Sequence, residues 1–367
     1  MTDVATDRAR VRAPLPATMR AMALTAIGGP ENLAAVELPR PWPEVDEVVI
    51  AVRTVAANRQ DIFTMRGAAN RTSALALPHV LGIDPAGVVA GLGTGVDGFA
   101  VGDRVVVKPS ISCGTCDLCV AGEDEACPRL TNVGVHRQGG MAEYVAVPAR
   151  NVFRIPDGVG FAEATAMSHS FPVALTMLRD RARLRPDDTV LVTSAAGAIG
   201  SAAVQLARLH GARVIAAAGG EERAAYVRGL GADVVIDYRA QPAFADEVLA
   251  AAPGGATLYV ESAGDPAIWK EALRAMARRG RAIVCGSHGG PIVELDLTWL
   301  FRNRIAILGC SGSNLAAYRA VLELAAAGRL RAHIHAVLPL DRAREAFEIL
   351  LGRGNRGKII LEVPVGR

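Results

Sequence analysis

Four cysteines close together in the sequence form the residue group with the clearest chemical meaning. The chain reads Cys113-Gly-Thr-Cys116-Asp-Leu-Cys119, and Cys127 follows eight residues later. Thiolates at this spacing suit tetrahedral coordination of one Zn²⁺, and Gly114 permits the tight turn that such a loop needs. Because four sulfurs leave no open position for a substrate, we expect this zinc to be structural. Disulfides or unrelated free thiols are the alternative, but disulfides need an oxidising compartment, which nothing else in the sequence indicates.

A turn of small residues follows a strand-like apolar run at residues 189–193. The turn reads Ser194-Ala-Ala-Gly197-Ala-Ile-Gly200, and a helical pattern comes next. Small residues let the backbone approach a pyrophosphate, whose charge is stabilised by free N–H groups at the helix N-terminus. Ala195 occupies the usual first glycine position, so a tight packing turn is the alternative. The position between strand and helix favours a dinucleotide site formed by Ala196, Gly197, Ala198, Ile199 and Gly200.

The residues after the next strand-like run bear on the choice between NAD and NADP. An NAD enzyme places a carboxylate there for the ribose 2′-hydroxyl. This chain has Gly219 at the strand tip and Arg223 nearby, an arrangement that accepts a 2′-phosphate, so the predicted cofactor is NADP(H). Glu221 and Glu222 are the counterargument, although at a helix start they would also stabilise the helix dipole.

Two later loops add candidates to this cofactor site. Tyr238 follows the third strand-like run and is predicted to stack on, or hydrogen-bond to, the adenosine phosphate. Gly286 begins the loop Gly286-Ser-His-Gly-Gly290, which follows another such run on the side where ligands bind in a parallel sheet, so His288 is expected near the cofactor.

Composition limits the class of protein. The chain has 367 residues, of which 51% are hydrophobic, enough for two domains with separate cores. Its net charge is +3 without a block of like charges, so the pattern of a nucleic-acid-binding protein is missing. No apolar run reaches the roughly 18 residues of a membrane span, and no secretory h-region occurs. We expect a cytoplasmic protein whose partners are a small-molecule substrate and a second copy of itself, with no nucleic acid and no membrane.

The chain changes character near residue 155. Residues 19–154 contain short β-branched runs separated by Gly and Pro, which is typical of a β-barrel-like domain. From residue 157 to about 290, strand-like runs alternate with Ala-rich helical stretches, which predicts a doubly wound parallel sheet. Cys285 and Cys310 lie in apolar runs and are expected to be small core residues. The last part holds two amphipathic helical patterns and a strand-like run that begins at Lys358.

Four of these features together resemble the medium-chain dehydrogenase/reductase superfamily. They are the cysteines, the glycine turn, the stretch Leu77-Pro-His-Val-Leu-Gly-Ile-Asp84-Pro-Ala-Gly87 and the ending Gly357-Lys-Ile-Ile-Leu-Glu362. The resemblance implies an α/β fold in which a GroES-like β-barrel catalytic domain is joined to a Rossmann doubly wound parallel sheet. The expected bounds are a flexible tail at 1–18, the catalytic domain at 19–155 and 315–367, and the cofactor domain at 156–314.

The resemblance also bears on a catalytic metal. Zinc alcohol dehydrogenases of the superfamily hold a catalytic zinc at positions that correspond here to Asn58, Ile83, Asp84 and His169. Ile83 cannot bind a metal and Asn58 offers a neutral amide oxygen, so too few ligands remain. The stretch 57–67 instead resembles the quinone oxidoreductase and enoyl reductase branches, which move hydride from NADPH to an electron-poor carbon without a metal.

Four residues receive roles or alternatives from this comparison. The amide N–H₂ of Asn58 would hydrogen-bond the acceptor carbonyl, or Asn58 would be a turn residue. Asp61 is a proton-donor candidate or an anchor of its loop. His169 would face the nicotinamide as a general acid, or be a half-buried structural histidine. Lys358 would contact the cofactor pyrophosphate, or be a strand-edge lysine.

The sequence thus predicts an NADPH-dependent oxidoreductase that reduces quinones or α,β-unsaturated carbonyl compounds, with one structural zinc. The alternatives are a zinc-dependent alcohol or aldehyde dehydrogenase and a catalytically inactive NADPH-binding scaffold. Related enoyl reductases have a proton-donating Tyr shortly after Gly67, and residues 68–70 of this chain supply none. A homodimer is expected through pairing of the strand-like run at 305–309 across a two-fold axis.

Overall fold

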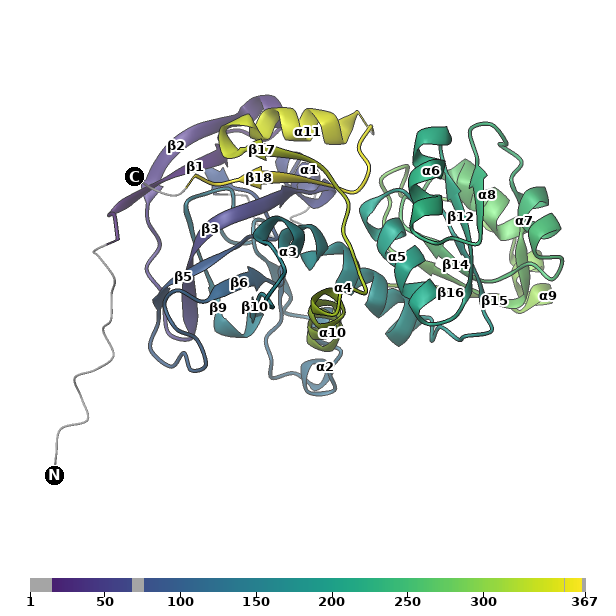
Figure 1. Cartoon of the computed structure of the whole chain (residues 1–367), viewed down its shortest axis with the longest axis horizontal. Coiled ribbons are helices and arrows are strands. Elements are labelled where there is room, and N and C mark those ends of the chain that lie inside the picture. Colours follow the sequence, from purple (N-terminus) through teal and green to yellow (C-terminus); the bar gives the residue numbers. More distant parts are fainter. Residues whose placement is uncertain (1–14, 68–75, 353, 365–367) are drawn as a thin grey trace.

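The computed structural model describes residues 15–67, 76–352 and 354–364. Most of the expected N-terminal tail and the residues 68–70 lie outside this part. The described chain forms a barrel lobe and a cofactor lobe that lie side by side (Figure 1). The predicted fold class, a GroES-like barrel joined to a Rossmann sheet, is confirmed. Among the described residues, no helix has the length and apolar character needed to cross a bilayer.

The barrel lobe is built around one long strand. Its strands are β1 (Thr18–Leu24), β2 (Leu33–Pro39), β3 (Glu47–Ala57), β4 (His79–Val80), β5 (Ala86–Leu92), β6 (Arg104–Val107), β7 (Ser110–Ile111), β8 (Thr131–Asn132), β9 (Tyr144–Pro148), β10 (Val152–Arg154), β17 (Ile334–Pro339) and β18 (Lys358–Glu362). Its helices are η1 (Pro30–Asn32), α1 (Arg59–Met65), α2 (Asp117–Val120), η2 (Asp124–Ala126), η3 (Ala149–Asn151), η5 (Leu340–Arg342) and α11 (Ala343–Leu351). β3 is buried along most of its length because β5, β9 and β18 all pair with it.

The last strand returns to the barrel. β18 pairs antiparallel with β3, in a register that sets Ile359 opposite Ala57 and Leu361 opposite Val55. Its residues are mostly β-branched or aliphatic, as a strand buried on both faces requires. This pairing brings Lys358, the first residue of β18, next to the end of β3 and the start of α1.

The cofactor lobe is a six-stranded parallel sheet. Its strands are β11 (Thr189–Val192), β12 (Arg213–Ala218), β13 (Val234–Asp237), β14 (Ala256–Glu261), β15 (Met276–Val284) and β16 (Ala306–Gly309). Its helices are α5 (Ala198–Leu209), α6 (Glu221–Gly229), α7 (Ala245–Ala251), α8 (Pro266–Arg274) and α9 (Leu297–Asn303). The strand order β13-β12-β11-β14-β15-β16 reverses direction between β11 and β14. A ligand crevice is expected at this point, beyond the carboxyl ends of the strands.

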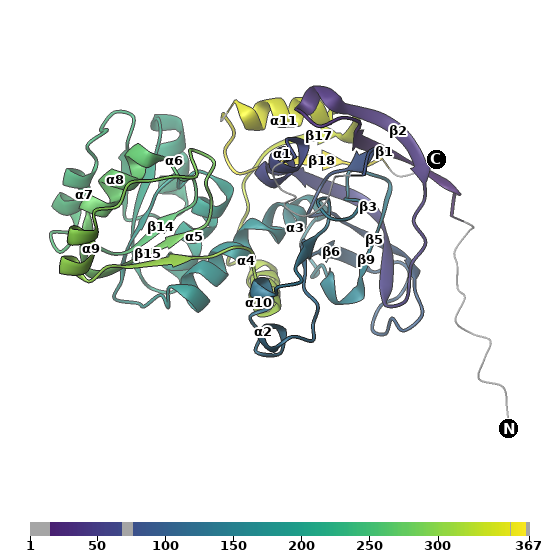
Figure 2. The same ribbon diagram turned by 180° about the vertical axis from the view of Figure 1, so that it is seen from behind.

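Four helical segments join the lobes. They are α3 (Phe161–Ser168), α4 (Ser170–Leu175), η4 (Thr176–Arg181) and α10 (Leu315–Ala326). Both views place α4 and α10 at the junction of the lobes (Figures 1 and 2). One apolar cluster runs through the junction, from Val106 and Phe153 of the barrel, through Tyr318 of α10, to Val190 of β11 in the cofactor sheet. The lobes therefore share a continuous core.

Candidate functional site

The four cysteines of the predicted zinc loop converge in the structure. Their sulfurs all lie within 4.8 Å of one another. The Sγ atom of Cys116 is 3.5 Å from that of Cys119 and 3.9 Å from that of Cys127, and the Cys113 and Cys119 sulfurs are 3.8 Å apart. A ZnS₄ tetrahedron with a Zn–S bond of about 2.3 Å has edges of about 3.8 Å. The sulfur positions therefore fit one tetrahedral zinc ion, which would cross-link this loop.

Local structure stabilises the thiolate form of Cys113. The backbone N–H of Thr115, the largest influence, helps to lower the pKa of Cys113 to about 5. The guanidinium of Arg129 lies 3.0 Å from the same sulfur and partly balances the negative charge that a tetrathiolate zinc site carries. Since the four sulfurs enclose the ion, the site has no open coordination position.

A cleft of about 470 Å³ lies between the lobes, beyond the carboxyl ends of the neighbouring strands β11 and β14. The glycine turn forms one wall. Ser194 has a φ of 50°, Gly197 donates its N–H to the Ser194 carbonyl at 2.9 Å, and α5 begins immediately afterwards. A Cβ on Gly200 would lie 2.5 Å from the Ser194 oxygen, so Gly200 permits tight packing behind the turn. Of the predicted cofactor residues, those that line the cleft are Ala196, Gly197, Ala198, Ile199, Gly219, Arg223, Tyr238, Gly286 and Lys358.

The far end of the cleft lies at the tip of β12. A Cβ on Gly219 would lie 2.8 Å from the ring of Tyr238, so only glycine allows Tyr238 to cover the tip of β12. Arg223 also lines this end. The two carboxylates that argued for NAD are engaged elsewhere: Glu221 pairs with Arg228 at 2.8 Å, and Glu222 pairs with Arg356 at 2.8 Å.

A buried polar cluster forms the opposite end, where the barrel meets the cleft. The ammonium of Lys358 donates to Oδ2 of Asp84 at 3.1 Å and to Oδ1 of Asn58. The amide nitrogen of Asn58 donates to the Ala56 carbonyl at 3.1 Å and to Asp84 Oδ1 at 3.0 Å. Both amide hydrogens of Asn58 are thus committed within the protein, which disagrees with the expectation that they bind the acceptor carbonyl. Lys358, expected at the pyrophosphate, lines the cleft and pairs with Asp84.

Asp61 lies behind this cluster and is fully buried. Its carboxylate accepts the backbone N–H groups of Asn58 at 2.9 Å and Gly82 at 3.0 Å. Burial, followed by the neighbouring Asp84 carboxylate, raises the pKa of Asp61 to about 7. These contacts match the anchoring alternative for Asp61 and leave it no path to a substrate in the cleft.

His169 lies at the junction of α3 and α4 and lines the cleft. Burial, followed by the Lys358 ammonium, lowers the pKa of His169 to about 4. The imidazole is therefore neutral at physiological pH and holds no excess proton, which disagrees with its expected role as a general acid in the free protein.

The donor set near Asp84 does not fit a catalytic zinc. Both oxygens of Asp84 are occupied, one by the Ala56 N–H and the Asn58 amide, the other by the Lys358 ammonium. Ile83 is buried and apolar. A divalent cation here would also lie beside the lysine charge, which is unfavourable in a buried site. Among the described residues, the four cysteines are the one group of three or more His, Cys, Asp or Glu side chains with metal-binding spacing.

Several residues of the cleft were not identified from the sequence. Phe63 of α1 stacks on His288 with ring centroids 5.5 Å apart, so the two lobes touch across the cleft. Cys285 and Cys310, expected in the core, are partly exposed and line the cleft at the ends of β15 and β16. Their position follows from the parallel register, which sets Val284 beside Gly309. The sequence feature that indicated this wall of the cleft was the loop containing His288, which was predicted to lie near the cofactor.

Comparison with known proteins identifies the family. Residues 44–157 match the alcohol dehydrogenase GroES-like domain, and residues 198–327 match the zinc-binding dehydrogenase family. The chain is 30% identical to an NAD-dependent alcohol dehydrogenase of Sulfolobus acidocaldarius, over 94% of this chain and 100% of that protein. It is 28% identical to an acryloyl-coenzyme A reductase of Metallosphaera sedula, over 92% of this chain and 99% of that protein.

Solved structures agree with the sequence relatives. A crystal structure of an NAD-dependent alcohol dehydrogenase, 37% identical, superposes with a TM-score of 0.89 over 94% of this chain and 100% of that one. A 2-octenoyl-CoA carboxylase reductase in complex with NADP and 2-octenoyl-CoA, 25% identical, gives a TM-score of 0.87 over 97% and 90%. The chain therefore belongs to the medium-chain dehydrogenase/reductase superfamily, the family of zinc-type alcohol dehydrogenases and their reductase relatives, and it is an oxidoreductase of that superfamily.

Proposed function

We propose that the protein is an NADPH-dependent reductase of quinones or α,β-unsaturated carbonyl compounds, with one structural zinc and no catalytic zinc. The observation that carries the proposal is that Asn58 and Asp84, two of the four positions matched to catalytic zinc ligands, are bound to each other and to Lys358. The acryloyl-coenzyme A reductase and the NADP-bound carboxylase reductase among the relatives are named for substrates of this class. The alcohol dehydrogenase relatives support the rival, a zinc-dependent alcohol or aldehyde dehydrogenase.

The absence of fitting zinc ligands decides which acceptors suit the site. A plain ketone becomes an alkoxide whose charge is localised on one oxygen and needs a strong electrophile. Conjugate addition spreads the developing charge over an enolate or a quinol, so a weaker donor is sufficient. The Lys358 ammonium lines the cleft, donates to Asn58 and Asp84, and has three N–H bonds in all, so the proposal assigns the third to an oxygen of the substrate. In this proposal the acceptor carbonyl lies against that ammonium.

The residues at the cofactor end of the cleft are assigned to parts of NADPH in the same proposal. Bound NADPH supplies the hydride. Gly197 and the α5 N-terminus hold the pyrophosphate, and Gly219, Tyr238 and Arg223 hold the 2′-phosphate, because Glu221 and Glu222 pair with other arginines. The Phe63–His288 stack limits water at the reacting end of the cleft. The proton required after hydride transfer comes from solvent, since His169 is neutral and Asp61 is enclosed.

The proposal includes the assembly and the compartment. β16 is the outer strand of the parallel sheet and is largely exposed, so two copies can pair through it across a two-fold axis. The cytoplasm provides the reducing conditions that keep four thiolates available to zinc.

A panel of acceptors tests the proposed function. The wild-type protein is assayed with NADPH and p-benzoquinone, cyclohexenone and crotonyl-CoA, and in the reverse direction with NADP and cyclohexanol. Turnover of at least one activated acceptor without oxidation of cyclohexanol is expected. Oxidation of the alcohol as the main activity would favour the zinc dehydrogenase, and tight NADPH binding without turnover of any acceptor would favour an inactive scaffold.

A further inference from the structure

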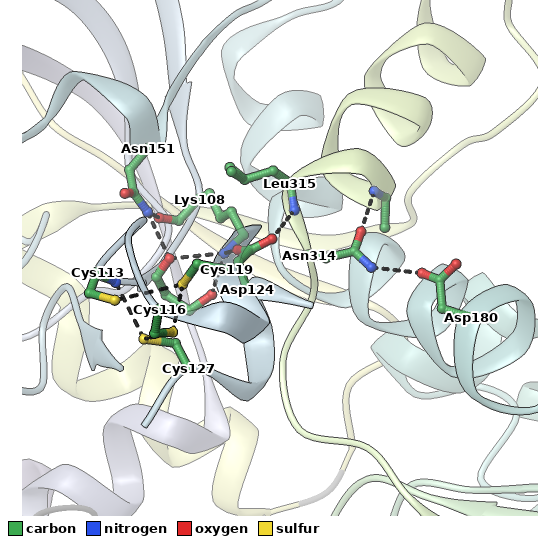
Figure 3. A network of polar contacts seen from close by, with 12 residues as sticks. Lys108, Cys113, Cys116, Cys119, Asp124, Cys127, Asn151, Asp180, Asn314 and Leu315 are labelled. Carbon is green, nitrogen blue, oxygen red and sulfur yellow. Dashed lines mark hydrogen bonds and ion pairs between the residues drawn. The ribbon is translucent and has the colours of Figure 1, made fainter. Parts of the chain in front are cut away.

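A polar network connects the zinc loop to the junction between the lobes (Figure 3). Its centre is Lys108, whose ammonium donates to the carbonyl and hydroxyl oxygens of Ser110 at 3.0 and 2.8 Å and to Asp124 Oδ2 at 3.0 Å. The side chains of Lys108 and Asp124 are 0% and 4% exposed. Asp124 lies between Cys119 and Cys127, so one end of this buried ion pair belongs to the zinc loop.

The second oxygen of Asp124 reaches across to α10. Its Oδ1 accepts the backbone N–H of Leu315, the first residue of that helix, at 2.8 Å. This N–H has no acceptor within the helix, because the first N–H groups of any helix lack a carbonyl one turn earlier. The zinc loop therefore provides the acceptor for the first N–H group of α10.

The residue before α10 is held from the other side. Asn314 accepts the N–H of Ala317 at 2.7 Å through Oδ1 and donates to Asp180 Oδ2 of η4 at 2.8 Å. Immediately before Asn314, the segment Cys310–Gly312 lines the cofactor cleft. A Cβ on Gly312 would lie 3.7 Å from the Cβ of Glu125, so the zinc loop also packs directly against this wall.

These contacts form a chain of short connections from the zinc loop to the cleft. The cysteine cluster lies in the loop that carries Asp124, Asp124 binds the N-terminus of α10, and residues 310–312 of the cleft wall lead directly into that N-terminus. A charged acceptor makes the Leu315 hydrogen bond stronger and more directional than a bond to a neutral group. Buried polar contacts of this kind select one arrangement of the elements that they join.

We infer that Asp124 is a positioning residue that couples the structural zinc site to the cofactor cleft. With the loop ordered by zinc, the 310–312 wall is held in the arrangement that accepts the dinucleotide. With the loop disordered, or with the Asp124–Leu315 hydrogen bond removed, the wall relaxes and the cofactor binds more weakly. This inference rests on the proposed function only in taking NADPH as the occupant of the cleft.

Leu315→Pro removes the single N–H that Asp124 accepts. Proline is well tolerated at the first helical position, and Asn314 has the extended backbone, φ −82° and ψ 166°, that a residue before proline adopts. Leu315→Ala is the matched control, because it also loses the leucine side chain but keeps the N–H. The dissociation constant of NADPH, measured by its fluorescence, is expected to be about fivefold larger for L315P than for L315A, with about one zinc per chain in both.

Removing zinc from both variants is the second test of the inference. Treating the full-length L315A protein with a chelator is expected to weaken NADPH binding and to be reversed by added zinc, whereas the same treatment of L315P has a smaller effect, because the connection is already cut. In the wild-type chain, hydrogen exchange at residues 310–317 is expected to speed up on zinc removal. Equal NADPH affinities for L315P and L315A, or zinc removal without effect on that affinity, would overturn the inference. A wild-type protein that binds NADPH but reduces no acceptor would overturn the proposed function and leave the coupling intact.

Discussion

The ammonium nitrogen of Lys358 lies 3.1 Å from Oδ2 of Asp84, although 274 residues separate them in the sequence. The two side chains are 5% and 0% exposed, so their charges meet in a buried site at the wall of the cleft. The contact depends on β18 pairing with β3, which carries the end of the chain back to the barrel. A lysine charge thus occupies the surroundings in which the zinc dehydrogenases of the superfamily would hold their metal.

Replacing this pair with amides tests the role of the charge. The double variant Lys358→Gln with Asp84→Asn keeps a hydrogen bond between the side chains and leaves no buried charge unpaired. We expect kcat with activated acceptors to fall about 100-fold, as for loss of one electrostatic donor, with a small change in the NADPH dissociation constant. The opposite pattern, weak NADPH binding with normal kcat, would assign Lys358 to the pyrophosphate as the sequence suggested.

Cofactor preference depends on Arg223 in the proposed function. Arg223→Gln is expected to lower kcat/KM for NADPH by about 10- to 100-fold and to change that for NADH about twofold or less, since a charged hydrogen-bond donor contributes about 1.5–3 kcal/mol. Arg274→Gln, on α8, where Arg274 pairs with Glu271 and does not line the cleft, is the control and should leave both values nearly unchanged. Equal losses for the two cofactors in R223Q would refute a 2′-phosphate site.

His169 leads to a prediction about how the stability of the fold depends on pH. Its pKa is lowered from 6.5 to about 4 by burial and by Lys358, so the folded protein binds the proton less well than the unfolded chain. The stability associated with neutral His169 is present above about pH 6.5 and is lost as the pH falls towards 4, by on the order of 3 kcal/mol.

Urea unfolding of the wild type and of His169→Gln at two pH values measures this effect. The wild type is expected to lose more stability than the variant between about pH 7 and pH 4.5. Parallel losses in the two proteins would mean that His169 titrates normally, and its role as a general acid would regain support.

The zinc loop gives a prediction in stability. Changing Cys113 and Cys116 to Ser is expected to remove the zinc and to lower the free energy of unfolding by several kcal/mol, on the order expected when a structural metal is lost. Cys310→Ser is the control, since it changes a cysteine outside the cluster and should retain about one zinc per chain. Full stability of the double variant without zinc would show that the loop is held by protein contacts alone.

Local features could be predicted from the sequence because they depend on residues that are neighbours along the chain. The strand-like run at 189–193 forms β11, and the zinc-loop cysteines, 14 residues apart at most, converge as their spacing predicts. The glycine turn precedes a helix, as expected, and that helix begins at Ala198, within the turn. The turn itself belongs to the helix N-terminus, which the period of the apolar residues does not reveal.

Contacts between distant segments could not be predicted from the sequence. Asn58 and Lys358 each have a plausible role by motif alone, but their actual partners follow from the β3–β18 register, which no local pattern specifies. No sequence pattern distinguished Asp124 from the other acidic residues of the loop, because its hydrogen bond to Leu315 spans 191 residues. The neutral state of His169 likewise results from burial near a lysine that lies in another element.

The proposal of hydride transfer without a catalytic metal is tested most directly by measuring zinc per chain by elemental analysis. The wild-type chain is purified without chelator, and the same preparation is assayed with cyclohexenone and NADPH. About one zinc per chain in a preparation that reduces the enone is expected, because the cysteine cluster accommodates one ion and the Lys358–Asp84 pair excludes a second. About two zinc ions per chain, with activity lost when the second is removed, would contradict it and would identify a zinc-dependent dehydrogenase.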